Sequence, residues 1–508
     1  MTLENFALYF ACTGLLLYAA LQFSLLTAEL PGPFFVAGRF DIWCLHHDEK
    51  LIVPDLRLFA LPEKERGTLQ DYAPYPVSAA FGLLGPWLSV AGIRLFGFSN
   101  AGLRVWSVVA AVLRQALFLS VCFQMLPAVP AAAFFCLQLF SVNDFILDHH
   151  AILENLLHLA LVVLVFFFVS APAEFATQAY VVGLGCAALV LMKPNFPVVA
   201  GLLAFCLLLT SGLGGSSRLV AGWLLGLVVF EGAQDLILWR LGLLSARVRN
   251  FLDAIRVHAG FKHEYLQKHF LPVGWRIFLR FPVFSADWLT LGNLRSLRPY
   301  PWPLYAGALL FYAVLALGAA RGGGLEAGLA LCIVVHLAGL TPFFYYPKRV
   351  TFFIPLTFLA LILSAQALLP PAALQWLWLP AVVLLAHQGR ALMHAIAGRN
   401  KNVEVFSRKL EELTFPGATV VMHCYPYRFT WQTRCRNLLS GDDQVVNNRM
   451  CEARAVKADY LILADLDAEN RARLCDAHLL VGAFTSSATE ADIPMRYDVF
   501  KITQGNTL

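Results

Sequence analysis

Ionisable residues recur at the edges of long apolar runs in this 508-residue chain. Some are carboxylates, which can act as general bases toward a hydroxyl group. Others are cationic or imidazole groups, which can hold and neutralise an anion such as a phosphate. Both kinds at one location would suit the transfer of a group from a phosphate to a hydroxyl. The residues concerned are Asp48, Glu49, Arg104, His149, Glu154, Lys193, Lys348 and Arg349.

The composition indicates what kind of protein positions these groups. Hydrophobic residues make up 59% of the chain and charged residues 14%, whereas soluble domains carry about 25% charged residues. The chain contains long apolar runs, such as 6–26, 157–169 and 219–229. A helix needs about 20 apolar residues to cross a bilayer. The net charge is +5 and no Lys/Arg-rich tract occurs, which argues against nucleic acid as a partner. We therefore expect a polytopic α-helical membrane protein.

Eleven apolar segments are predicted to cross the membrane as helices. The first lacks the basic start and the small-residue cleavage site of a secretory signal, so we expect it to be retained. A further stretch, 77–98, contains Gly82, Gly85, Pro86, Gly92 and Arg94 and is expected to lie in the interface or re-enter the membrane. An odd number of crossings places the two ends of the chain on opposite sides. The predicted crossings are 6–28, 104–123, 127–145, 152–170, 176–192, 197–212, 219–239, 303–320, 326–341, 350–369 and 373–391.

The composition changes near residue 398. Residues 399–508 are rich in charge and predict alternating short helices and strands, which indicates a small soluble α/β domain after a membrane domain of residues 1–398. An even number of cysteines in such a domain suggests two disulfides and an oxidising compartment. Four buried thiols in a cytosolic domain are the alternative. The cysteines are Cys424, Cys435, Cys451 and Cys475.

Two large segments, 29–103 and 240–302, then lie on the outer side with the C-terminal domain. The second holds nine Lys and Arg residues between 241 and 300 against three acidic residues, which fits the positive-inside rule badly. One explanation is that the topology is inverted. The other is that these cations serve an anionic ligand at the outer surface, such as a lipid phosphate.

Several short motifs occur in a fixed order around these segments. Asp48-Glu49 is followed by an Asp-Tyr-Ala-Pro turn that starts at Asp71, and then by Phe96-Gly-Phe-Ser with Arg104 shortly after. This order resembles the protein-mannosyltransferase-like branch of the GT-C glycosyltransferases, which includes the aminoarabinose transferases that modify lipid A. The C-terminal domain fits as well, because several bacterial members of this branch end in a periplasmic α/β domain.

The resemblance continues to about residue 370. His149 stands five residues before Glu154, where the family often has Arg. Lys193-Pro resembles a Lys-Pro at the outer end of a later helix. Tyr346-Pro-Lys-Arg349 resembles the Pro-x-Arg-Tyr that opens a late helix, although Val occupies the last position.

The resemblance implies a GT-C fold with about eleven transmembrane helices in the bacterial inner membrane. It implies an inverting transfer of a sugar from undecaprenyl phosphate to an envelope acceptor at the periplasmic face, with no cofactor required. Lipid A, another glycan and a protein are all possible acceptors. We assign Asp48 as the base, with Glu49 as the alternative, and Glu154 as a support for the base or the sugar. The donor phosphate would be held by Lys193, Lys348, Arg349, His149 and Arg104.

Other interpretations of the same residues are open. A transporter or flippase for a lipid-linked glycan would predict internal repeats and interrupted helices at mid-bilayer, and no clear repeat occurs. A glycan polymerase or ligase would also use outer cations but has no obvious need for the acidic pair. Lys348 and Arg349 could be interface anchors. His149 and His150 could bind a divalent metal together with Asp148 and Glu154, although the five-residue spacing from His149 to Glu154 suits one helical face poorly. No nucleotide-binding fingerprint or Ser/Cys nucleophile motif is present.

The topology is tested with reporters that are active only in the cytoplasm. Fused after residue 400, such a reporter should be silent, because the C-terminal domain is expected in the periplasm. Fused near the N-terminus, the same reporter should be active. Activity after residue 400 would place the domain inside and would remove the common outer face of the assigned residues.

Overall fold

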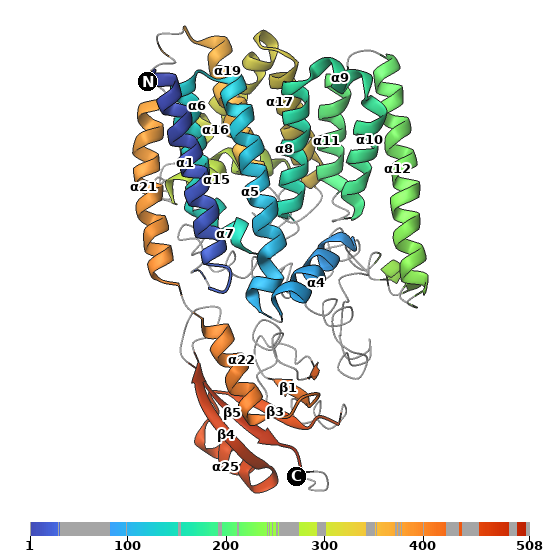
Figure 1. Cartoon of the computed structure of the whole chain (residues 1–508), viewed down its shortest axis with the longest axis vertical. Coiled ribbons are helices and arrows are strands. Elements are labelled where there is room, and N and C mark those ends of the chain that lie inside the picture. The colour runs from blue at the N-terminus through green and yellow to red at the C-terminus, as the bar shows by residue number, and fades with distance from the viewer. Residues whose placement is uncertain are drawn as a thin grey trace.

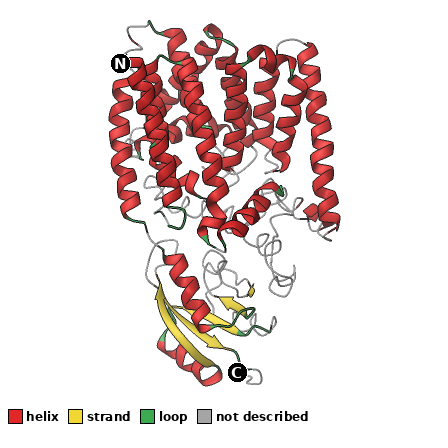
Figure 2. Ribbon diagram, in the orientation of Figure 1, coloured by secondary structure: helices red, strands yellow, loops and turns green. Residues whose placement is uncertain are grey.

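The computed structural model describes most of the chain. The described residues are 2–28, 82–97, 99–150, 154–191, 196–210, 213–240, 274–291, 301–341, 353–370, 378–399, 401–422, 436–438, 457–486 and 495–503, with a few single residues between them. Figure 2 shows a bundle of helices and a smaller sheet beyond one of its ends.

Each of the eleven apolar segments predicted to cross the membrane overlaps a helix or a closely spaced helix pair. Within the described residues, α1, α5 and α12 are long and apolar enough to span a bilayer on their own. α6 and α7 pass the same test as a pair, bent by 55°. The chain is thus a polytopic helical membrane protein, while the number of crossings stays a prediction. The helices are α1 (Leu3–Ser24), α5 (Asn100–Met125), α6 (Ala128–Leu139), α7 (Val142–His149), α8 (Glu154–Ser170), α9 (Pro172–Thr177), α10 (Ala179–Ala188), α11 (Phe196–Leu209), α12 (Leu213–Arg240), α16 (Pro301–Arg321), α17 (Gly324–Leu340), α19 (Ile354–Leu368) and α21 (Trp378–Ala397).

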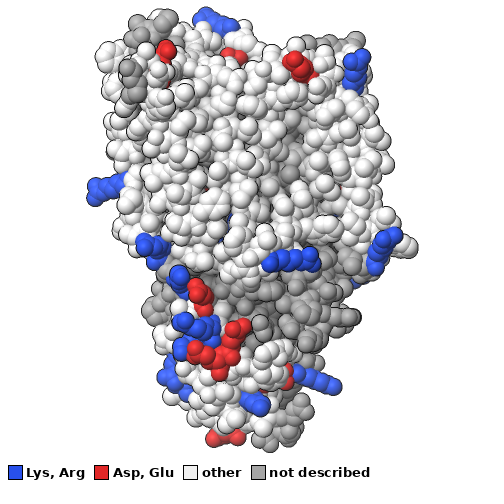
Figure 3. Space-filling model, viewed as in Figure 1, with Lys and Arg blue, Asp and Glu red and all other residues white. Residues whose placement is uncertain are grey.

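The two ends of the bundle differ in what lies beyond them. The N-terminus lies at one end and the C-terminal sheet at the other (Figure 1). Between the ends, the visible face of the bundle is almost free of charged side chains, which gather at both ends and on the sheet domain (Figure 3). This pattern is the one expected of helices in contact with hydrocarbon.

Among the described residues, two helices of the bundle, α4 and α15, lie outside the predicted crossings. α4 (Leu84–Phe96) lies at the end of the bundle near the sheet, where it packs against the start of α5 (Figure 1). This placement agrees with an interfacial helix in 77–98. α15 (Ile277–Thr290) packs against α16 and α21 with Phe281 and Trp288 buried. The sequence patterns did not predict this helix within residues 240–302, and the side of the membrane on which the segment lies stays a prediction.

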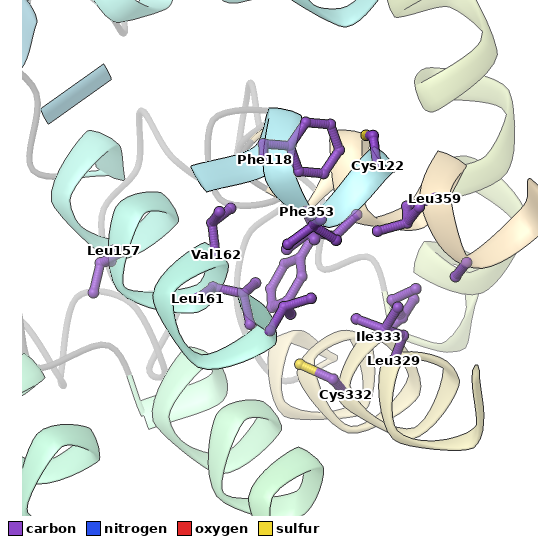
Figure 4. Close-up of a cluster of buried hydrophobic side chains, with 14 of the residues drawn as sticks. Phe118, Cys122, Leu157, Leu161, Val162, Leu329, Cys332, Ile333, Phe353 and Leu359 are labelled. Atoms are coloured by element: carbon purple, nitrogen blue, oxygen red, sulfur yellow. The ribbon is translucent and has the colours of Figure 1, made fainter. Parts of the chain in front are cut away.

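The core of the bundle is formed by apolar side chains from helices that are distant in sequence. Figure 4 shows α5, α8, α17 and α19 converging on one cluster. Close packing of this kind, rather than the hydrophobic effect, holds helices together in lipid. The labelled residues are Phe118, Cys122, Leu157, Leu161, Val162, Leu329, Cys332, Ile333, Phe353 and Leu359.

Small residues bring α10 and α12 into backbone contact. A Cβ atom on Gly222 would overlap the carbonyl oxygen of Tyr180, and one on Gly183 would overlap that of Leu219. Gly226 stands one turn beyond Gly222, so α12 carries the Gly-x-x-x-Gly spacing that lets membrane helices approach closely.

The C-terminal sheet has the strand order β2-β1-β3-β5-β4. β1 pairs in parallel with β2 and β3, whereas β5 pairs antiparallel with β3 and β4. Helix α22 packs an apolar cluster onto one face of the sheet, and helix α25 packs another onto the opposite face. Asp467 caps α25 by accepting a hydrogen bond from the backbone N–H of Asn470 (2.7 Å), which lowers the pKa of its carboxyl. The elements are α22 (Asn402–Leu413), β1 (Thr419–Met422), β2 (Arg436–Leu438), β3 (Tyr460–Ala464), α25 (Ala468–Ala477), β4 (Leu479–Ser486) and β5 (Met495–Lys501).

The structure corrects the prediction of two disulfides in residues 399–508. Cys475 lies on the exposed side of α25 as a free thiol, so four cysteines cannot form two bonds. Cys424, Cys435 and Cys451 lie outside the described residues. The even cysteine count was misleading because an exposed helical thiol needs no partner to be stable.

The contact between α10 and α12 predicts a stability difference between two glycines on the same helix. Gly222→Ala should lower the thermal unfolding temperature of the detergent-solubilised protein, because overpacking costs about 1–3 kcal/mol. Gly232→Ala is the matched control, since a Cβ atom there meets nothing within 4 Å. Its unfolding temperature should be unchanged or higher. Equal melting of the two variants would contradict the close helix contact.

Candidate active site at the end of the bundle

Several helix ends meet at the end of the bundle that faces the sheet domain. α1 and α7 end here, and α5 and α8 begin here (Figure 1). α5 and α8 run in the same direction, since Asn155 bonds Ser107 near this end and Gln124 bonds Ser170 (3.2 Å) at the other. α11 and α17 run in opposite directions, so the start of α11 lies beside the end of α17.

A buried ion pair lies inside the bundle near this end. Arg114 on α5 donates two hydrogen bonds to Asp148 on α7, at 2.8 and 2.7 Å. The hydroxyl of Tyr18 on α1 donates a third bond to the same carboxylate, at 2.5 Å. All three residues are buried. Both oxygens of Asp148 are thus occupied, and the pair joins three helices.

Arg114 also reaches α8. Its Nη1 lies 3.0 Å from Nδ1 of His158, which is buried. Because a guanidinium has only donors, Nδ1 of His158 accepts and the proton of the neutral ring sits on Nε2. Arg114 therefore links the last turn of α7 to the first turns of α8.

The backbone between α7 and α8 is held by two small polar side chains. Asn155 donates toward the carbonyl oxygens of Leu147 (3.1 Å) and His150 (3.3 Å), and Ser107 donates to that of His150 (2.6 Å). Carbonyl groups at a buried helix end need such donors. They fix the path of the chain as it leaves α7 toward Glu154.

Arg104 and His149 lie together at the point where the chain leaves α1. Nη1 of Arg104 donates to the carbonyl oxygen of Ala28 (2.8 Å) and lies 3.5 Å from Nε2 of His149. Nε2 of His149 lies 3.1 Å from the same carbonyl, and its Nδ1 lies 3.3 Å from the amide oxygen of Gln22. These two predicted site residues therefore meet at the start of the segment that contains Asp48 and Glu49.

The start of α7 is held from the opposite side by α21 and α15. The side-chain oxygen of Gln388 accepts a hydrogen bond from the backbone N–H of Val142 (2.9 Å), and its amide group donates to the carbonyl of Leu289. Asn143 donates to the carbonyl of Trp288 (2.7 Å). The side chain of Gln388 thus provides a hydrogen-bond partner for a backbone N–H at the start of α7 and for a backbone carbonyl at the end of α15.

The predicted site residues divide into three groups. Arg104 and His149 are brought together. Glu154 begins α8, and its side chain is not described. The remaining predicted site residues lie outside the described residues. The segment with the acidic pair lies between α1 and α4, and the segment with the Lys-Pro lies between α10 and α11. The segment with the Lys-Arg pair lies between α17 and α19. The residues in this third group are Asp48, Glu49, Lys193, Lys348 and Arg349.

The described side chains do not form a metal site with His149. No group of three His, Cys, Asp or Glu side chains suited to a metal ion occurs among the residues that the structure describes. Asp148, the carboxylate next to His149, is engaged by Arg114 and Tyr18.

The sequence interpretation missed Arg114 and Tyr18 and did not assign Asp148 to an ion pair. A signal was available, because Arg114 lies in the middle of an apolar helix, where a charge needs a partner. Arg104, Ser107 and Arg114 also recur at helical spacing and are all buried, so they share the face of α5 that meets α7 and α8.

Comparisons with known proteins give matches among solved structures. No protein-family model matches the sequence, and no curated protein sequence matches it. Two crystal structures of ArnT from Cupriavidus metallidurans are similar to it, one bound to undecaprenyl phosphate and one in the apo state. The first has a TM-score of 0.60 at 14% identity and covers 99% of both chains. The second has a TM-score of 0.58 at 14% identity and covers 98% of this chain and 97% of the other.

The alignments extend over the helical bundle and the C-terminal sheet together, since they leave almost no part of either chain unmatched. At this identity the likeness concerns the fold. The chain therefore has the GT-C fold in the form found in ArnT, as its sequence motifs predicted.

Proposed function

We propose that this protein is a glycosyltransferase that takes a sugar from a polyprenyl phosphate, such as undecaprenyl phosphate, and places it on a hydroxyl of an envelope acceptor. The observation that supports this most directly is the likeness in fold over nearly the whole chain to a protein crystallised with undecaprenyl phosphate. The motif order in the sequence gives independent support, because it rests on residue types and not on the fold.

The proposed reaction needs one base and a set of cations. The acceptor oxygen attacks the anomeric carbon, the bond from that carbon to the phosphate oxygen breaks, and the base takes the hydroxyl proton. The phosphate leaves as an anion that needs neutralising but no proton. By analogy with inverting glycosidases, a single displacement forms no covalent intermediate. We assign Asp48 as the base, with Glu49 as the alternative and Glu154 as support.

The cations assigned to the donor phosphate are Lys193, Lys348 and Arg349. The segments that carry them begin and end at helices of the bundle, which is where a lipid-linked phosphate would enter from the bilayer. Arg104 and His149 complete the assigned set. Their shared contact with the carbonyl of Ala28 would bring them beside the acidic segment.

The proposed location is the bacterial inner membrane, with the active site and the C-terminal domain in the periplasm. Lipid A, another envelope glycan or a protein would be the acceptor. Transfer of a radiolabelled sugar from undecaprenyl phosphate by the detergent-solubilised protein tests the proposal. Product formation would separate an enzyme from a transporter, which would move the donor without consuming it.

Asp48→Asn should abolish transfer without unfolding the protein. Asn keeps the size and the hydrogen bonding of Asp but cannot take the acceptor proton, and general-base catalysis is worth about 10²–10⁴-fold. Turnover is measured by the transfer assay, and donor binding is measured separately and should survive. Wild-type turnover of Asp48→Asn together with an inactive Glu49→Gln would move the chemistry to the neighbour.

Lys193→Ala and Arg349→Ala should each raise the apparent KM for the donor, lower turnover, or both. Each removes a charge that attracts the donor phosphate and stabilises it as it leaves. Expression and melting temperature should stay close to those of the wild type. If both variants keep full donor affinity and rate, these residues are interface anchors and not ligands of the phosphate.

A further inference from the structure

The ion pair inside the bundle has no free group with which to react. Both oxygens of Asp148 accept from Arg114, and one also accepts from Tyr18. Three of the about four acceptor positions of this carboxylate are therefore engaged by Arg114 and Tyr18, both of which are buried in the bundle. Asp148 is therefore not a second catalytic carboxylate, although it lies only six residues before Glu154.

The position of the ion pair relates it to the proposed site. Asp148 immediately precedes His149 in the last turn of α7. His158 stands four residues after Glu154, about one turn further along α8. Arg114 contacts both Asp148 and His158 and so holds the two helix ends on either side of residues 150–153.

The geometry of arginine matters to this arrangement. A planar guanidinium can bond a carboxylate through two parallel N–H groups and still offer another donor, whereas the ammonium group of lysine is a point charge. The hydroxyl of Tyr18 on α1 donates to the same carboxylate, which adds a third helix to the arrangement. The orientation of α7 relative to α8 is thus set by directional bonds, in addition to apolar packing.

We infer that Arg114 is a positioning residue of the transferase: through Asp148 and His158 it sets the relative placement of His149 and Glu154. This inference rests on the proposed function. An ion pair that serves stability alone would behave differently, since buried pairs can often be replaced by uncharged side chains of similar volume that pack well, without loss of stability. The two roles therefore separate when the charges are removed together.

The experiment compares four variants in the transfer assay with undecaprenyl-phosphate sugar, in parallel with thermal unfolding in detergent. Arg114→Lys keeps the charge but loses the paired geometry. Arg114→Gln combined with Asp148→Asn removes both charges and so leaves no unpaired ion. Tyr18→Phe removes only one hydroxyl from Asp148. Tyr312→Phe is its matched control, because the hydroxyl of Tyr312 lies buried in the bundle with no hydrogen-bond partner among the described residues.

The expected result is a loss of kcat in folded protein. Arg114→Lys and the double variant should each lower kcat by about 100-fold, the effect of a displacement of about 1 Å in a reacting group. The KM for the donor should stay near the wild-type value, and the double variant should melt close to wild type. Tyr18→Phe should lower kcat several-fold, whereas Tyr312→Phe should not.

Wild-type kcat in the double variant or in Arg114→Lys would overturn the inference and leave the pair a structural one. If neither variant yields folded protein, the tyrosine pair decides, and equal kcat for Tyr18→Phe and Tyr312→Phe overturns the inference. A wild-type protein that transfers no sugar would instead refute the proposed function. The two failures are therefore distinguishable.

Discussion

A guanidinium in the interior of a membrane helix bundle must be neutralised and hydrogen-bonded, and much of this structure follows from meeting that requirement for Arg114. Hydrocarbon offers no water to solvate a charge. Asp148 on α7 supplies the counter-charge, His158 on α8 accepts a further N–H, and Tyr18 on α1 bonds the carboxylate. Four helices are thereby fixed in direction as well as in distance, which apolar packing alone does not achieve.

The same requirement applies to backbone groups where helices end inside the bundle. The chain bends by 55° between α6 and α7, so the start of α7 would expose N–H groups without partners. Gln388 satisfies one of them and also bonds the end of α15. Since Gln388 lies on α21, the helix that leads to the C-terminal domain is tied to the helix that ends at the candidate site.

The cysteines of the C-terminal domain no longer indicate the compartment in which the domain lies. Because Cys475 is a free thiol, the domain cannot form the two disulfides that were the argument for an oxidising compartment. What supports the proposed periplasmic orientation is the motif resemblance, together with the position of the domain beyond the end of the bundle where the assigned segments begin and end (Figure 1). The domain and the candidate site share this end whichever side of the membrane it faces.

The sequence by itself determined the class of protein, because a chain with long apolar runs and few charges folds most readily as helices that cross a membrane. It also predicted the GT-C fold through motif order, and the helical segments through hydropathy. It did not predict α15, in which Arg280 and Pro282 interrupt the apolar pattern and whose buried face packs against α16, α19 and α21. Nor did it pair Arg114 with Asp148, 34 residues away, or bring Arg104 and His149 to the carbonyl of Ala28. Hydropathy is a sum over neighbours along the chain, whereas a buried charge is matched by partners from other helices, so only the tertiary structure decided those contacts.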